Sequence, residues 1–261
     1  MLGLGTSVTN IDSGQIYKEL SELSNYADLD IHFDFSNLSG DMEDGATFSA
    51  AINNLGAGGA DNNIDAVVGE PTLDTRSLSR ACVDFPNSGD SDHIFSMANA
   101  YETTGKAMTF FIVMQLDVDT TQILVASAPD GDSDYIQFFS NGRIRIRLAG
   151  GTATSVVTSN TNNSTISYAP VVNTPMVMVW QRLSDGISYF WNDNGLFTAA
   201  LDDTGDATWT LGAIGGTTSG SNTDFDGKVC EVGLYDADIN EANVSILLES
   251  LCTKWGINRR E

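Results

Sequence analysis

Alternation of apolar and polar residues dominates the chain from residue 29 onward. In residues 29–35, leucine, isoleucine and two phenylalanines alternate with two aspartates and a histidine. A period of two places one set of side chains on each face of a β-strand. The pattern therefore predicts a strand with one buried face.

Similar short segments follow at close spacing, separated by turn-forming residues. They predict strands at 80–85, 92–97, 107–116, 122–126, 135–139, 143–148, 176–183, 187–191, 208–214 and 226–235. The run at 107–116 is apolar almost throughout, as in a strand buried on both faces. Asn194-Gly195 predicts a tight hairpin because both residue types tolerate positive φ. Residues 36–79 are expected to be rich in loops.

One helix is expected near the C-terminus. Asn240 can cap its start and Gly256 can end it. Apolar residues between them follow helical spacing on one face: Val244, Leu247, Leu248, Leu251 and Trp255. Many short strands with a single late helix favour an antiparallel β-sandwich over a parallel βαβ fold.

The charge of the chain is strongly one-sided. Lys and Arg number 12 against 35 Asp and Glu, which gives a formal net charge of −23. Such a surface repels the phosphates of nucleic acids and anionic membranes, so neither is expected as a partner, and it favours divalent cations. The three cysteines, Cys82, Cys230 and Cys252, include no C-x-x-C pair. Three buried free thiols are expected, with a Cys230–Cys252 bridge as the alternative.

Residues 1–28 differ from the rest of the chain. A glycine-rich start precedes Ile16, Leu20 and Leu23, which have helical spacing. We interpret this segment as an arm that anchors a domain at 29–261, with a leader of no structural role as the alternative. No secretory signal and no membrane span are expected, because neither a basic region before an apolar run nor about 18 successive apolar residues occurs. A role outside the cell would then require release by lysis or within a larger particle.

Motifs near the C-terminus carry a resemblance to a known superfamily. The segment Gly-Lys-Val-Cys-Glu-Val-Gly-Leu-Tyr-Asp at 227–236 precedes a helix that ends in Lys-Trp-Gly at 254–256. This arrangement resembles the concanavalin-A-like lectin/glucanase superfamily, and within it the laminin-G-like modules of bacterial and phage surface proteins. The resemblance covers about residues 29–257. It implies an antiparallel jelly-roll β-sandwich with a short N-terminal arm and one C-terminal α-helix.

The first eight residues, Met-Leu-Gly-Leu-Gly-Thr-Ser-Val, also resemble the start of tailed-phage virion proteins that carry such modules. The resemblance implies a structural protein of a bacteriophage virion, either a capsid decoration or a tail-associated adhesion protein. Its partners would be other virion proteins, contacted through the arm, and further copies of this chain. The alternative function is a carbohydrate-binding lectin for host surface glycans, with or without Ca²⁺. The superfold hosts several functions, so fold alone does not decide between them.

No catalytic motif is found. Glycosidases of this type need two carboxylates that flank one bond, and the Glu-x-Asp-x-x-Glu pattern that supplies them is absent. Glu231 lies in the closing strand and is interpreted as structural. His32 is expected on the outward face of its strand, between two aspartates. There is no G-x-S-x-G, H-E-x-x-H or P-loop motif, so a non-enzymatic protein is expected.

Three groups of residues are candidates for binding. Arg143, Arg145 and Arg147 share one strand face, where they suit an acidic glycan or neighbour; pairing with aspartates of this chain is the alternative. Trp191 shares a face with Tyr189 and would stack on a sugar ring if exposed; burial in the core is the alternative. Three acids alternate in a glycine-containing loop that suits Ca²⁺, with an ordinary hairpin turn as the alternative: Asp130, Asp132 and Asp134.

Overall fold

The computed structural model describes residues 29–40, 42–49, 51–86, 92–129, 131–138, 140, 144–148, 154–157, 171–193, 195–196, 201–202, 208–217 and 224–259. The expected arm at 1–28 lies outside these residues, so the arm and the domain boundary after it stay predictions.

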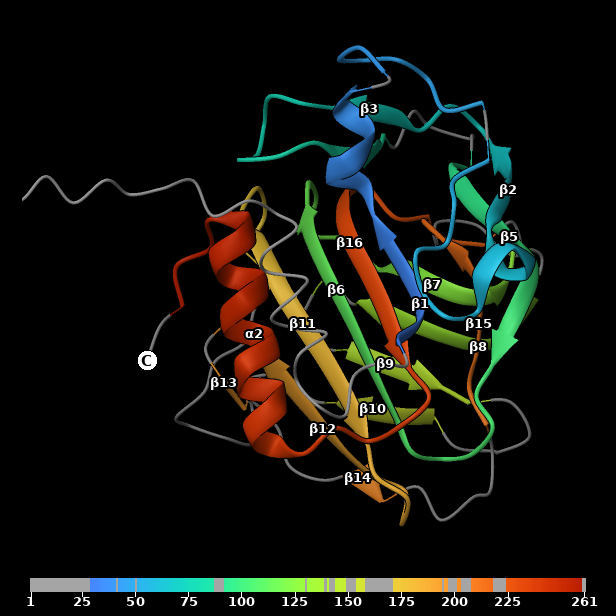
Figure 1. Cartoon of the computed structure of the whole chain (residues 1–261), viewed down its shortest axis with the longest axis vertical. Helices are drawn as coiled ribbons and strands as arrows, with labels where there is room; N and C mark the ends of the chain where they lie inside the picture. Colours follow the sequence, from blue (N-terminus) through green and yellow to red (C-terminus); the bar gives the residue numbers. More distant parts are fainter. Residues whose placement is uncertain are drawn as a thin grey trace, which may run out of the picture.

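Two antiparallel sheets stack face to face (Figure 1). In the first sheet the strand order is β13-β12-β11-β6-β16-β4-β3, and β1 and β14 pair with β16 and β12. Its strands are β1 (Leu29–Asp34), β3 (Thr72–Asp74), β4 (Cys82–Phe85), β6 (Met108–Leu116), β11 (Pro175–Arg182), β12 (Ile187–Asn192), β13 (Gly195–Leu196), β14 (Leu201–Asp202) and β16 (Gly227–Tyr235).

The second sheet has the order β10-β9-β8-β7-β15-β5-β2. Its strands are β2 (Ile64–Val68), β5 (Ile94–Glu102), β7 (Gln122–Ala128), β8 (Gly131–Phe138), β9 (Ile144–Arg147), β10 (Thr154–Val157) and β15 (Thr210–Ile214). Two 3-10 turns, η1 (Phe35–Gly40) and η2 (Gly59–Asn62), lie between β1 and β2. The expected antiparallel jelly-roll β-sandwich with a C-terminal helix is confirmed.

Aromatic side chains fill the space between the sheets. The ring centroids of Trp180 and Trp209 lie 5.4 Å apart with an interplanar angle of 85°, and Phe110 meets Trp209 edge-on at 5.3 Å. Edge-to-face contacts of this kind add to the stabilisation from burial. Both tryptophans are buried.

Helix α2 (Glu241–Trp255) covers the outer face of the first sheet and lies across β11 (Figure 1). The side chain of Asn240 accepts a hydrogen bond from the backbone N–H of Asn243, and Gly256 ends the helix in the left-handed conformation with φ of 66°. These are the N-cap and C-cap that the sequence predicts. Because the outer face is covered, the first sheet is buried on both sides along β6 and β16.

The three cysteines lie in the apolar layer between this sheet and α2. All are free and buried, as expected. Burial and the neighbouring Cys82 raise the pKa of Cys230, and burial raises the pKa of Cys252 to about 11. Cys230 and Cys252 therefore stay protonated at neutral pH and act as small apolar side chains.

Two local predictions were wrong. The hairpin between β12 and β13 is present, but Gly195 pairs with Asn192 and therefore lies in β13 and not in the turn. Residues 131–134 belong to strand β8 and not to a loop, because β8 continues its pairing with β7 as far as Gly131. The loop-rich region at 36–79 also contains the short strands β2 and β3.

Candidate functional site

A cluster of charged side chains is buried beneath the C-terminal end of α2. Lys254 on the helix donates to Glu231 on β16 at 2.7 Å, and its Nζ lies 3.0 Å from Asp34 Oδ2 on β1. Trp255 Nε1 donates to the same Glu231 oxygen at 2.8 Å, and His32 Nε2 lies 2.9 Å from the other oxygen. The cluster joins α2 to two strands of the sheet.

The carboxylate of Glu231 is ionised in this setting. Burial alone would raise its pKa, but the hydrogen bond from His32 and the charge of Lys254 lower that pKa to about 2. An ionised carboxylate only accepts hydrogen bonds, so His32 donates through Nε2. Glu231 is structural, as expected. His32 lies on the outer face of its strand, but α2 and its neighbours leave it only 5% exposed.

A cleft opens at the other end of α2, where the helix begins. Its volume is about 410 Å³, within the range of small-ligand sites, roughly 300–1,000 Å³. Its described lining comes from β11, from β12 and from the turn into α2: Gln181, Leu183, Tyr189, Trp191, Asp238, Ile239, Asn240 and Glu241.

Strand register places the floor of the cleft. Gln181 on β11 pairs with Tyr189 on β12, and Val179 pairs with Trp191. Side chains two residues apart on a strand share a face, so Gln181, Tyr189 and Trp191 all lie on the face that α2 covers. Tyr189 is partly buried, whereas Trp191 is 7% exposed and Gln181 is buried. The first turn of α2 closes one side of this aromatic floor.

The polar groups of the cleft are unequally satisfied. Gln181 Nε2 donates to the backbone oxygen of Ile239. The buried indole N–H of Trp191 has no hydrogen-bond partner among the described residues. Asp238 and Glu241 are exposed at the rim. None of the eight described lining residues is basic.

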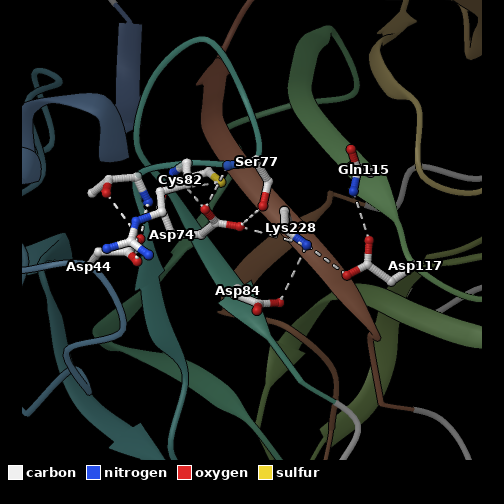
Figure 2. Close-up of polar contacts among 10 residues, drawn as sticks. Asp44, Asp74, Ser77, Cys82, Asp84, Gln115, Asp117 and Lys228 are labelled. Atoms are coloured by element: carbon white, nitrogen blue, oxygen red, sulfur yellow. Dashed lines mark hydrogen bonds and ion pairs between the residues drawn. The ribbon is translucent and has the colours of Figure 1, made fainter.

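A second ionic cluster surrounds Lys228 on β16 (Figure 2). Lys228 Nζ lies 2.8 Å from Asp117 Oδ2, 3.8 Å from Asp74 Oδ2 and 3.9 Å from Asp84 Oδ1. Burial lowers the pKa of Lys228, but the hydrogen bond to Asp117 and the three negative charges outweigh it and raise that pKa overall. Lys228 supplies the positive charge in this group of acids, so the cluster is interpreted as structural.

The arginine stripe lies on β9 of the second sheet. Arg145 donates to the side-chain oxygen of Gln137 at 3.3 Å, and the guanidinium of Arg147 lies 5.7 Å from the ring centroid of Tyr135. Both arginines are partly buried, and the residues between them face the core. Arg143 lies outside the described residues, and binding by the stripe stays a prediction.

Of the three candidate calcium ligands, only Asp134 has a described side chain. Asp134 is 1% exposed, and its Oδ2 accepts a hydrogen bond from the backbone N–H of Thr210 at 3.1 Å. Asp132 lies on β8 with an undescribed side chain, and Asp130 lies outside the described residues. Within the described ranges, no group of three or more His, Cys, Asp or Glu is placed to hold a metal ion. Binding of Ca²⁺ by this loop stays a prediction.

No protein-family model matches this chain, and no curated protein is significantly similar to it in sequence. Among solved structures, the botulinum neurotoxin serotype G binding domain has a TM-score of 0.59 at 11% identity, over 87% of this chain and 52% of that chain. The serotype D ligand binding domain in complex with N-acetylneuraminic acid has a TM-score of 0.57 at 9% identity, over 85% and 51%. The botulinum neurotoxin DC binding domain in complex with rat synaptotagmin II has 0.51 at 10%, over 79% and 52%.

This chain therefore spans about half the length of these binding domains. At such low identity the likeness establishes the β-sandwich fold and carries no ligand with it. Across the described residues, no helix combines the length and apolar character needed to cross a bilayer.

Proposed function

We propose that this chain is a non-enzymatic carbohydrate-binding module, and that the cleft at the start of α2 holds the sugar. The similar solved structures are binding domains, which supports binding over catalysis. The cleft supplies the chemistry that a sugar requires: Tyr189 and Trp191 offer apolar ring surface, and Gln181, Asp238 and Glu241 offer hydrogen-bonding groups. Aromatic faces pack against the C–H face of a pyranose while polar groups bind its hydroxyls.

The unpartnered indole N–H of Trp191 is the observation that carries this proposal. A buried donor without an acceptor costs about 1–3 kcal/mol. The indole N–H groups of Trp180 and Trp209 also lack partners, but both residues lie in the core between the sheets. Trp191 differs because it lines an open cleft. Its N–H is buried in this structure, so a hydroxyl oxygen of a ligand would become its acceptor only where the cleft widens around the indole.

The placement of the buried acids supports a non-enzymatic role. Asp34 and Glu231 both lie beside Lys254, and their side chains are 0% and 1% exposed. A glycosidase needs two carboxyl groups that reach opposite sides of one substrate bond. Here the ammonium group lies within ion-pair distance of both carboxylates, under the helix and away from the cleft.

The virion role expected from the N-terminal resemblance stays a prediction. It rests on residues 1–8, which lie outside the described residues, and no comparison bears on it. In that role the arm would bind other virion proteins, copies of the chain would assemble, and the sandwich would display the cleft toward host glycans. The two functions are compatible.

A glycan array with matched variants tests the proposed site. Wild-type protein is expected to bind a defined set of glycans. Tyr189→Ala should weaken that binding by up to about tenfold in affinity, since contact with an aromatic ring contributes on the order of 0.5–1.5 kcal/mol. Tyr189→Phe should retain most of it, because the ring surface remains.

Arg145→Ala on the second sheet is the control for position. If it abolishes binding while Tyr189→Ala does not, the ligand lies on the arginine stripe and the cleft is not the site. If wild-type protein binds no glycan on a broad array, carbohydrate binding itself is contradicted.

A further inference from the structure

We infer that the cleft selects sugars by charge: it prefers an amine-bearing pyranose, accepts a neutral one and rejects sugars that carry a carboxylate. This inference rests on the proposed function, because it names the ligand class of the same cleft. Two observations support it. The exposed acids Asp238 and Glu241 line the same cleft as its aromatic floor, and the indole N–H of Trp191 in that floor has no partner among the described residues.

Among the residues that the structure describes, the two rim acids have no counter-charge at the site. No ion pair is found for either among the described residues, and none of the eight described lining residues is basic. The acids of the other two clusters differ in this respect. Asp117 lies 2.8 Å from Lys228, and Glu231 lies 2.7 Å from Lys254. The rim carboxylates are therefore left to interact with whatever enters the cleft.

The charge of a ligand should therefore change its affinity for the cleft in a predictable direction. An ammonium group on the sugar is attracted by both rim carboxylates and can donate hydrogen bonds to them. A sugar carboxylate meets two like charges and finds no basic side chain among the described lining residues. The net charge of −23 on the whole chain acts in the same direction but is screened beyond about 8–10 Å at moderate salt.

The sialic acid bound in one similar solved structure makes this inference specific. The serotype D ligand binding domain is in complex with N-acetylneuraminic acid, a sugar acid. The fold alone does not fix the ligand. If a sugar acid of this kind entered the cleft of the present chain, its carboxylate would meet the two rim acids.

The test compares three β-1,4-linked oligosaccharides of equal length: glucosamine, N-acetylglucosamine and mannuronic acid oligomers. Isothermal titration at low salt is expected to rank them in that order, with the first and last at least about tenfold apart in affinity. Higher ionic strength should narrow the gap.

The double variant Asp238→Asn/Glu241→Gln is expected to bring the three affinities within about threefold of one another, because it removes both rim charges. Asp61→Asn/Glu249→Gln is the matched control. It removes the same number of negative charges at two exposed positions outside the cleft lining, and it should keep the wild-type ranking.

The possible outcomes distinguish the charge selectivity of the cleft from carbohydrate binding itself. Equal affinities or a preference for mannuronate in the wild type would overturn the charge selectivity and leave carbohydrate binding intact. The charge selectivity of the rim would also be overturned if both double variants reduced the affinity differences among the oligomers equally. The net charge of the protein, and not the rim, would then be the cause. Failure of all three oligomers and of every array glycan to bind would overturn the proposed function together with this inference.

Discussion

The two ends of helix α2 contact the same face of the first sheet, but the polar side chains are hydrogen-bonded within the fold at one end and not at the other. At the C-terminal end, Trp255 donates its indole N–H to Glu231 at 2.8 Å, and Lys254 pairs with the same carboxylate. At the N-terminal end, Trp191 lines a cleft of about 410 Å³ and its indole N–H has no described partner. One end is closed by charge pairing, and the other is left open beside two acids.

This difference separates a structural site from a binding site within a single interface. A buried polar group is normally satisfied within the fold, and an exception calls for an explanation. Three side chains, Lys254, Trp255 and His32, bond to Glu231, so its carboxylate is satisfied within the fold. The cleft has donors, carboxylates and aromatic surface that the described chain leaves unused. We therefore assign stability to the closed end and recognition to the open end.

The largest expected effect comes from breaking the closed end. Glu231→Ala removes a carboxylate that Lys254, His32 and Trp255 all contact, and it leaves Lys254 buried with less compensation. Loss of one partner of a buried ion pair costs about 3–5 kcal/mol. Urea denaturation is expected to show a fall in the free energy of unfolding of this size.

Glu241→Gln at the open end is the matched control. Glu241 is exposed in the first turn of α2, so its loss should cost less than about 1 kcal/mol through the helix dipole. Equal costs at the two residues would contradict the division of roles along the helix.

A smaller effect is expected from acid. The pKa of Glu231 is lowered in the folded protein to about 2 from an ordinary value of 4.5. The unfolded chain therefore binds this proton more readily, so the stability contributed by Glu231 is complete above pH of about 4.5 and declines as the pH falls toward 2. The lowered pKa of Glu231 contributes about 3 kcal/mol to the free energy of unfolding above this pH range.

Stability curves of wild type and Glu231→Ala against pH measure this contribution. The difference between the two proteins should shrink as the pH falls through that window. A difference that stays constant from pH 6 to pH 2 would mean that Glu231 is not ionised under the helix.

The sequence predicted the closed end better than the open one. Strict alternation predicted β1, and the apolar run predicted β6. Helical spacing predicted α2, and Asn240 and Gly256 predicted its two caps. These are local patterns, and each is set by a period of two or of 3.6 residues. Glu231 was also assigned correctly as structural because of its place in the closing strand.

The open end depends on pairing between distant segments, which no local pattern reveals. Tyr189 and Trp191 share a face by alternation, but their meeting with Gln181 depends on the register of β11 with β12. The stretch from Asp238 to Glu241 has no period, and its place over these strands follows from how α2 packs on the sheet. Around Asp134 the glycine and the alternating acids predicted a loop, whereas the strand β8 begins at Gly131 and pairs with β7.

The most direct test of the account observes the two tryptophans at once. Four indole N–H resonances are expected in a ¹⁵N–¹H spectrum, and Trp191→Phe and Trp255→Phe assign two of them. Addition of a glycan that binds should shift the Trp191 resonance, since a ligand oxygen becomes its acceptor, and should leave the Trp255 resonance in place. Binding that leaves Trp191 unmoved, or that shifts Trp255 instead, would contradict the assignment of recognition to the open end of α2.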